Sequence, residues 1–175
     1  QAEAFGTIAR SELCAQAKAD CVRILADAVG CDGMCAGQYL DMAGENKQLT
    51  EADLNEINSR KTGALLIAAC CMGVAAAGGS EEMLNAAAAY GAAIGAAFQI
   101  RDDILDVIST SEQLGKPIGS DADEHKNTYM ALLGEKKCME MVEKLTETAK
   151  SELKKAFTDA DFLCSLADSM VTRVN

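Results

Sequence analysis

Apolar positions recur with a helical period along almost the whole chain, and clear breaks divide the pattern into segments. No stretch alternates apolar and polar residues as a strand would, so the pattern predicts an all-α fold. Residues 109–125 are polar and contain the only proline, and we expect them to form a loop. The predicted helices cover residues 3–29, 33–42, 50–77, 80–108, 127–133 and 135–157, with a last helix after residue 158.

Capping residues mark where several of these helices begin. Thr50 with Asp53, and Thr158 with Asp161, have the spacing of a capping box, in which each side chain accepts from the other residue's backbone N–H. Ser80 precedes two glutamates, which suit the positive end of a helix dipole. The sequence therefore predicts helix starts at these positions.

Composition agrees with closely packed helices in one domain. Of the 175 residues, 49% are hydrophobic, 25% are charged and 4% are aromatic. That balance argues against disorder, and the chain is long enough for a sizeable core. Abundant alanine favours helices over strands. We expect residues 1–175 to form part of a single domain.

The chain is acidic, with a net charge of −11. Nucleic acid and anionic membranes are not expected as partners, because both also carry negative charge. No apolar run reaches the length expected of a membrane span, and no signal peptide is found. Since the first residue is Gln1 rather than methionine, we interpret the chain as a piece of a longer protein or as a processed one.

The eight cysteines do not have the spacing of a disulfide framework. Six fall in predicted helices, mostly on apolar faces, where a thiol acts as a small hydrophobic group. Cys31 and Cys35 have a metal-like spacing, but His125 is the only histidine and no second close pair completes a zinc site. Reduced thiols in a cytoplasmic protein are the preferred interpretation.

Three aspartates lie in an otherwise apolar part of the 80–108 helix, within GAAFQIRDDILDVI. At 3.6 residues per turn, Gln99, Asp102, Asp103 and Asp106 form one polar stripe, named here the acidic stripe. Carboxylates one turn apart repel by roughly 3 kcal/mol at an effective dielectric of 20, and a divalent cation would reverse that sign. A metal site is therefore favoured over a solvated helix face. The opposite, core-facing stripe consists of Ile100, Ile104, Val107 and Ile108.

The face that carries the acidic stripe continues upstream through residues with almost no side chain, namely Gly91, Ala92 and Gly95. A face that is first small and then acidic suits the floor of a cleft better than a solvated surface. We therefore expect a cavity along this side of the 80–108 helix.

Two shorter motifs add polar groups that a ligand could use. In GQYLD, Gln38 and Asp41 share one helical face, an arrangement that alone is more typical of a solvated helix end. In KTGALL, Lys61 shares its face with apolar residues, so an inward ammonium would require an anion. The alternative is a lysine whose stem follows the apolar surface while its charge reaches water. The apolar residues on that face are Leu54, Ile57, Ala64 and Ala68.

The loop LGKPIGSDADEHKNTY combines two glycines, which let backbone approach a ligand, with the cations Lys116 and Lys126, which suit phosphate. It lacks the Walker pattern, so it is not a nucleotide P-loop. Taken alone, it is more typical of an ordinary polar loop.

Taken together and in order, GQYLD, KTGALL, FQIRDDILD and GKPIGSDADEHKNTY resemble the C-terminal half of the trans-isoprenyl diphosphate synthases. The resemblance extends over essentially the whole chain and is strongest to the bacterial farnesyl diphosphate synthases. It implies the C-terminal helices of an all-α bundle around a central cavity, with room for a prenyl chain beside the small residues. It also implies a homodimer and a Mg²⁺-dependent condensation of an allylic diphosphate (dimethylallyl or geranyl) with isopentenyl diphosphate.

Roles for individual residues follow from the same resemblance. It implies Asp102 as a direct Mg²⁺ ligand, with Asp103 and Asp106 completing the cluster, partly through water. It implies Lys61 and Lys116 as ligands of the allylic diphosphate.

Other residues would act on the reacting carbon atoms or help to bind substrate. The resemblance implies that Thr62, Gln99 and Gln38 offer dipoles to the allylic cation. Substrate-binding roles are implied for Asp41, Asp121 and Lys126.

The family's first aspartate-rich motif and its isopentenyl diphosphate pocket lie upstream of the residues present here. The chain is therefore expected to hold half of an active site and to be inactive alone, and its product length is not readable. The alternatives are a synthase of longer product (geranylgeranyl or polyprenyl), a terpene cyclase and a non-catalytic helical partner subunit. The partner subunit is least favoured, because all three aspartates are intact.

Overall fold

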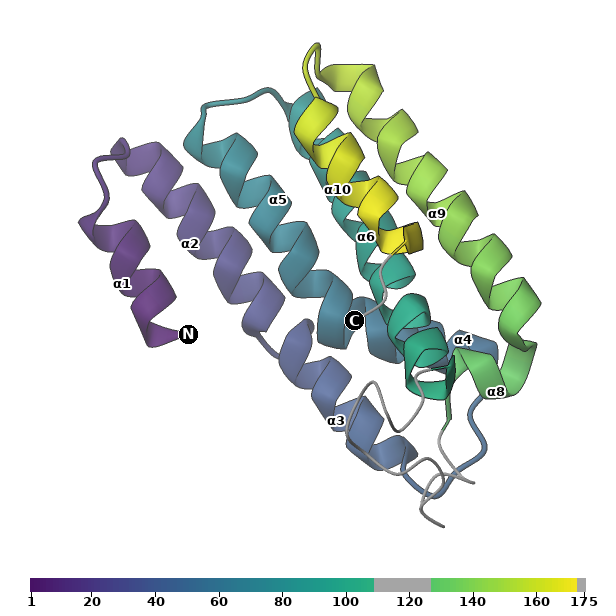
Figure 1. Cartoon of the computed structure of the whole chain (residues 1–175). Helices are drawn as coiled ribbons and strands as arrows, with labels where there is room; N and C mark the ends of the chain where they lie inside the picture. The colour runs from purple at the N-terminus through teal and green to yellow at the C-terminus, as the bar shows by residue number, and fades with distance from the viewer. Residues whose placement is uncertain (109–126, 173–175) are drawn as a thin grey trace.

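The computed structural model describes residues 1–108 and 127–172, and every regular element in these ranges is a helix, as the sequence predicted (Figure 1). In chain order the elements are α1 (Ala2–Arg10), α2 (Ala15–Val29), α3 (Met34–Gly44), α4 (Glu51–Asn58), the π-helix η1 (Ser59–Gly63), α5 (Ala64–Ala76), α6 (Glu81–Ile108), α8 (Tyr129–Leu133), α9 (Glu135–Ala156) and α10 (Asp161–Thr172).

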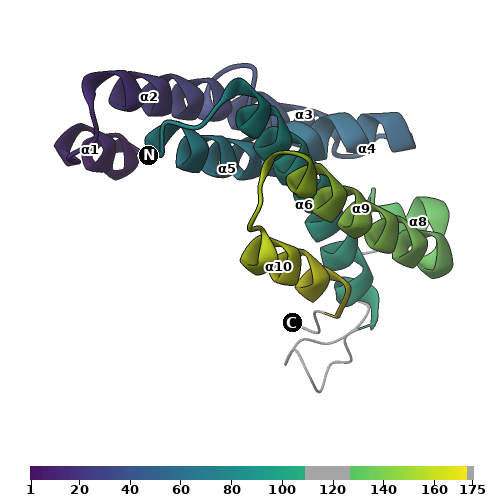
Figure 2. The same ribbon diagram turned by 90° about the horizontal axis from the view of Figure 1, so that it is seen from above.

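Four helices, α2, α5, α6 and α9, lie side by side in that order, so α6 has long neighbours on both sides (Figure 1). Helix α3 follows α2 and contacts η1. Helix α10 packs on α9 and α6 (Figure 2). The arrangement brings η1, which contains the start of the KTGALL motif, into contact with both α3 and α6.

Helix α6 supplies much of the core at the end that carries the aspartates. Ile100 and Ile104 are almost fully buried and share an apolar cluster with Leu54 and Tyr129. These two isoleucines confirm the predicted core-facing stripe. Val107 departs from it, because this residue is 58% exposed.

The predicted 3–29 helix is wrong in one respect, because it is divided into α1 and α2. Ser11 and Cys14 both have extended backbone, with ψ angles of 166° and 159°. The Ser11 hydroxyl also donates to the Ile8 carbonyl at 2.7 Å, a local bond that competes with continuation of the helix. The chain turns back at this point, and α1 lies against α2 (Figure 1).

The predicted 50–77 helix is also divided, by the π-helical turn η1. A π-turn accommodates one extra residue within a helix, and such turns are frequent at functional sites. It shifts the phase of the side chains that follow, which a count of α-helical steps does not detect. Here the turn carries Lys61 and Thr62.

Two of the predicted helix starts are confirmed. The capping box of Thr50 and Asp53 has both of its reciprocal hydrogen bonds. Ser80 accepts from the Met83 backbone N–H at 3.2 Å. The predicted 33–42 helix extends further, to Gly44.

The capping box predicted at Thr158 and Asp161 is wrong. Helix α10 begins at Asp161 itself, so the residue in the capping position is Ala160, whose carbonyl accepts from the Cys164 N–H at 2.8 Å. The Asp159 carboxylate accepts from the Asp161 N–H at 3.3 Å.

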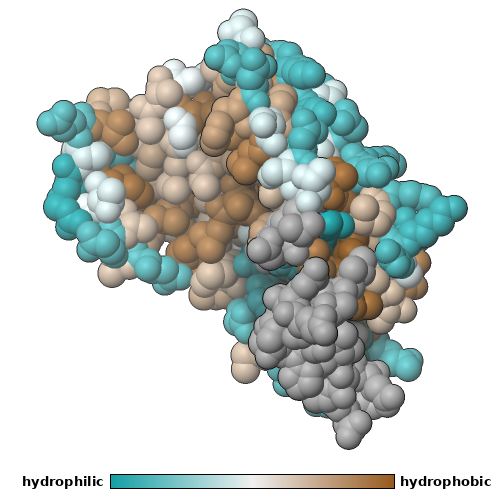
Figure 3. Space-filling view, in the orientation of Figure 1, coloured by the Kyte–Doolittle hydropathy of each residue, from teal (hydrophilic) through white to brown (hydrophobic). Residues whose placement is uncertain are grey.

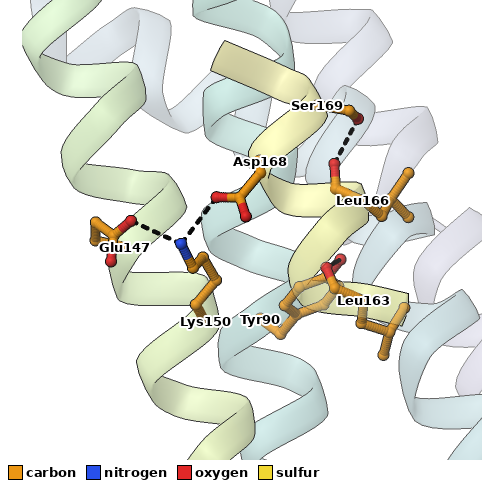
Figure 4. A network of polar contacts seen from close by, with 7 residues as sticks. All are labelled: Tyr90, Glu147, Lys150, Leu163, Leu166, Asp168 and Ser169. Atoms are coloured by element: carbon orange, nitrogen blue, oxygen red, sulfur yellow. Dashed lines mark hydrogen bonds and ion pairs between the residues drawn. The ribbon is translucent and has the colours of Figure 1, made fainter. Parts of the chain in front are cut away.

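Polar contacts fix α10 against the rest of the bundle (Figure 4). Lys150 on α9 donates to Asp168 on α10 at 2.8 Å and to Glu147 at 2.9 Å. Hydrogen bonding to Asp168, and then to Glu147, raises the pKa of Lys150 above its usual range. The hydroxyl of the buried Tyr90 on α6 donates to the Leu163 carbonyl at 2.9 Å. Helix α10 is therefore tied to both of the helices that it covers.

The small residues of α6 serve close helix packing, which corrects the expected cavity floor. Gly91 and Gly95 are buried, and a methyl group at Gly91 would lie 2.8 Å from Ile67 Cα on α5. A methyl group at Gly95 would lie 3.1 Å from Gly63 Cα in η1. The space beside these glycines is therefore filled by neighbouring backbone rather than left open for a prenyl chain. Ala92, between them, is exposed.

Gly91→Ala should destabilise the protein, although alanine is the better helix former by about 1 kcal/mol. The added methyl group displaces the α5 backbone, and overpacking of this kind costs about 1–3 kcal/mol. Gly73→Ala on α5 is the matched control, because nothing lies within 4 Å of its added methyl group, and it should stabilise the fold slightly. Urea denaturation measures both changes. An equal gain in the free energy of unfolding for both variants would contradict the close packing at Gly91.

Helix α5 is apolar on every side, yet its buried residues are only Ala68, Cys71 and Val74. A helix that is apolar all round is normally enclosed in a larger core. Figure 3 shows a broad apolar area on the face that contains α2 and α5. Leu66 near Lys61 and Phe98 on α6 are half-buried, so neither side chain is fully exposed to water.

Within the described ranges, α6 over residues 81–107 is long and apolar enough to cross a membrane by length and composition. This differs from the expectation that no apolar run reaches such a length. Half of the qualifying stretch is buried in the fold, and ordinary core helices meet the same criterion. The finding therefore does not show a membrane span.

Candidate functional site

Lys61 and Asp41, which come from separate sequence motifs, form an ion pair between η1 and α3. Lys61 Nζ donates to Asp41 Oδ2 at 2.6 Å, and the two side chains are 37% and 43% exposed. The anion expected beside an inward Lys61 is thus supplied by the chain itself. The ammonium still reaches water, so both sequence interpretations of Lys61 are partly correct.

Gly37 allows α3 to lie directly on the π-turn. A methyl group at Gly37 would lie 2.2 Å from the Lys61 backbone nitrogen and 2.6 Å from its Cα. Arg60 adds polar ties, because it donates to the Asp32 carbonyl at 2.8 Å and to the Glu56 carboxylate at 2.6 Å. The position of the Lys61 backbone is therefore set by close packing against α3 and by the hydrogen bonds of the adjacent Arg60.

A row of hydrogen bonds links η1 to the acidic stripe on α6. Thr62 Oγ1 donates to Gln99 Oε1 at 3.4 Å, and Gln99 Nε2 donates to Asp103 Oδ1 at 3.3 Å. N–H···O bonds usually span about 2.7–3.2 Å and O–H···O bonds about 2.5–3.0 Å. Both bonds here are longer than these ranges, so they are weak. They nevertheless bring together three side chains that the sequence assigned to one site.

Asp103 is half-buried and held on both of its oxygen atoms. Its Oδ2 accepts from the Tyr129 backbone N–H at 2.8 Å, in addition to the bond from Gln99. Burial raises the pKa of Asp103 above its usual range, and the nearby Asp106 and Asp102 charges add to the rise. The two hydrogen bonds act in the opposite direction, because they stabilise the carboxylate.

The rest of the acidic stripe has the donor chemistry of a magnesium site. Asp102 is half-buried and Asp106 is exposed, and carboxylate oxygens are the donors that Mg²⁺ prefers. Asp102 and Asp106 lie one turn apart on the same face of α6. No three His, Cys, Asp or Glu side chains of residues 1–108 and 127–172 form a group that could hold a metal. Mg²⁺ usually keeps several waters and is held by one or two carboxylates, which is the donor chemistry of Asp102 and Asp106.

The remaining predicted residues are not brought into this row. Lys116, Asp121 and Lys126 lie outside the described residues. Gln38 is exposed on α3, one turn before Asp41, and its role stays a prediction.

Sequence reasoning missed Tyr129 and its partner Asn55. Tyr129 is 2% exposed, and its hydroxyl donates to Asn55 Oδ1 on α4 at 2.7 Å. Arg101 was also missed: it is buried beside the stripe, with Nη1 3.1 Å from the Met139 sulfur. Tyr129 is the last residue of the GKPIGSDADEHKNTY motif, but the motif does not indicate which residues it contacts.

The chain matches the family model of polyprenyl synthetase over residues 1–171. A farnesyl diphosphate synthase of Haemophilus influenzae is 38% identical over 154 residues, which cover 87% of this chain and 52% of that protein. The chain thus spans about half the length of the curated relatives that it matches.

Solved structures show the same fold. The geranylgeranyl pyrophosphate synthetase of Pyrococcus horikoshii has a TM-score of 0.86 and 26% identity, covering 98% of this chain and 64% of that one. The geranyltransferase of Helicobacter pylori, complexed with magnesium and isoprenyl diphosphate, has a TM-score of 0.78 and 28% identity, covering 96% of this chain and 55% of that one. Since the family model covers nearly the whole sequence and the helices are arranged as in these synthases, the chain belongs to the polyprenyl synthetase family.

Proposed function

We propose that the complete protein is a trans-prenyltransferase that joins an allylic diphosphate, dimethylallyl or geranyl, to isopentenyl diphosphate and makes farnesyl diphosphate. The observation that carries the proposal is the row of polar groups from η1 to α6. It places an ammonium, two neutral dipoles and three carboxylates on adjoining elements, in the residues Lys61, Thr62, Gln99, Asp102, Asp103 and Asp106.

In the proposed reaction, the bond between C1 of the allylic substrate and its diphosphate oxygen breaks, and the electron pair leaves with pyrophosphate. The double bond of isopentenyl diphosphate attacks C1, and loss of a proton from the adduct restores a double bond. Bound Mg²⁺ would supply positive charge that stabilises the leaving pyrophosphate.

The described residues would bind the allylic diphosphate, stabilise the allylic cation and hold the metal. Lys61 would bind the allylic diphosphate as a point charge, and Asp41 would orient that ammonium through the 2.6 Å contact. The oxygen atoms of Thr62 and Gln99 would direct fixed dipoles toward the allylic cation. Asp102 would hold Mg²⁺.

A synthase of longer product is the second candidate, favoured by the structural similarity to a geranylgeranyl pyrophosphate synthetase. Incubating the complete protein with geranyl diphosphate, isopentenyl diphosphate and Mg²⁺, followed by mass spectrometry, separates the two candidates. Farnesyl diphosphate as the end product supports the first, and geranylgeranyl diphosphate or longer products support the second. Absence of any condensation product would contradict both.

The 175-residue chain alone should show no sustained prenyl transfer. It spans about half the length of its relatives, and half of a diphosphate site loses both charge and positioning. The same incubation with the purified 175-residue chain provides the measurement. Continuous turnover would show that these residues contain the whole site.

We also propose a cytoplasmic homodimer. All eight cysteines are free, which accords with a reducing compartment. The partly exposed apolar surface of α5 accords with association. Light scattering on the complete protein tests the oligomeric state, and a monomer would contradict the dimer.

A further inference from the structure

We propose that Tyr129 is a positioning residue that couples the acidic stripe to the π-turn carrying Lys61 and Thr62. The inference rests on the proposed function, in which Lys61 binds the allylic diphosphate and Asp102 holds Mg²⁺. Tyr129 itself is not placed against substrate.

Tyr129 makes two polar contacts in different directions. Its backbone N–H donates to Asp103 Oδ2 at 2.8 Å, and its hydroxyl donates to Asn55 Oδ1 at 2.7 Å. The first contact lies on α6 and the second on α4. One residue therefore connects the helix of the acidic stripe to the helix that runs directly into η1.

These contacts close a ring of polar interactions. From Asn55, helix α4 leads into η1, where Thr62 contacts Gln99, and Gln99 contacts Asp103. Asp103 then returns to Tyr129. Since the Thr62 and Gln99 bonds are long, at 3.4 Å and 3.3 Å, the two shorter bonds of Tyr129 carry more of the connection.

The segment before Tyr129 is anchored to the same side of the bundle. Asn127 donates to the Lys47 carbonyl at 2.8 Å and accepts from the Leu49 N–H at 3.0 Å. Thr128 caps α8 by accepting from the Ala131 N–H. Tyr129 therefore enters the core from a backbone that is already fixed, which gives its two bonds a defined direction.

Packing alone does not explain the hydroxyl. The Tyr129 ring lies in the apolar cluster with Leu54, Ile100 and Ile104, and a phenylalanine would fill that space equally well. The hydroxyl reaches beyond the cluster to Asn55, with Asn58 close to it one turn further along α4. Removing the Tyr129 hydroxyl should therefore weaken the connection between α6 and α4 while leaving the apolar core packed.

The experiment uses Tyr129→Phe in the complete protein, with Tyr39→Phe as the matched control because Tyr39 is 71% exposed on α3. Calorimetric titration with pyrophosphate at several Mg²⁺ concentrations gives the half-saturating Mg²⁺ concentration. We expect it to rise about fivefold in Tyr129→Phe, the effect of one lost hydrogen bond, and to stay unchanged in Tyr39→Phe. Combining Tyr129→Phe with Asn55→Ala should add nothing further, because both changes remove the same contact.

Hydrogen exchange of the metal-free protein provides a readout that does not depend on ligand binding. Faster exchange of the η1 amides in Tyr129→Phe supports the coupling, because those amides are remote from Tyr129 in sequence. Faster exchange confined to α8, with an unchanged Mg²⁺ requirement, would overturn it and leave Tyr129 a local structural residue. If the wild-type protein binds no pyrophosphate with Mg²⁺, the proposed function fails, and the exchange of the η1 amides alone decides the coupling.

Discussion

Replacing Asp102 by alanine should lower the rate of prenyl transfer by about 10²–10³-fold, the range found when one preorganised electrostatic partner is removed from an active site. Asp102 is half-buried in the acidic stripe, one turn from Asp106. Its loss should remove a direct metal ligand and leave the leaving group without full charge compensation. Steady-state kinetics of the complete protein, with saturating Mg²⁺ and both diphosphates, measures the effect.

Asp27→Ala is the matched control for this change. Asp27 lies on α2 with its side chain 74% exposed and pairs with Arg23 at 3.8 Å on the surface. The Asp27→Ala substitution removes the same charge as Asp102→Ala. It should leave the rate of prenyl transfer unchanged, because exposed ion pairs contribute little to stability. Full activity of Asp102→Ala at saturating Mg²⁺ would show that the metal does not depend on this carboxylate.

Gly37→Ala should lower kcat/KM by about 10²-fold, because small displacements of a catalytic group have effects of that size. The added methyl group would lie 2.2 Å from the Lys61 nitrogen, so α3 and the π-turn have to separate. In the wild-type protein Lys61 Nζ lies 2.6 Å from Asp41 Oδ2. Separation of the two helices moves the Asp41 carboxylate away from this ammonium. Kinetics well below the melting temperature, together with a thermal melt, measure the displacement and the stability separately.

Gly73→Ala serves again as the control, since it introduces the same methyl group where nothing lies within 4 Å. It should retain full activity. If Gly37→Ala also retained full activity below its melting temperature, the close contact between α3 and η1 would not position Lys61.

The helical pattern predicted the elements well where side-chain periodicity alone determines them. Ile100 and Ile104 face the core as their spacing requires, and Thr50 caps its helix. The break at Ser11 was not predicted, because it depends on a local hydroxyl bond and not on an apolar period. The π-turn was not predicted either, because one extra residue in a turn changes the phase without changing the composition.

For the site, the motifs identified side chains but not their contacts. Lys61 and Asp41 were both selected, yet their pairing depends on the approach of α3 at Gly37. The missing side chain of Gly91 was interpreted as a sign of open cavity space, whereas it allows the α5 backbone to pack closely against α6. Tyr129 meets Asp103 across a sequence separation of 26 residues, and no local pattern indicates such a contact.

The central claim is that the acidic stripe and Lys61 bind one diphosphate through Mg²⁺. Calorimetric titration of the complete protein with pyrophosphate tests it most directly, with Mg²⁺ present and again after chelation by EDTA. We predict tight binding by the wild-type protein only with Mg²⁺, and weak binding by Asp102→Ala and by Lys61→Met under the same conditions. Equal Mg²⁺-dependent affinity in wild type and Asp102→Ala would contradict the account.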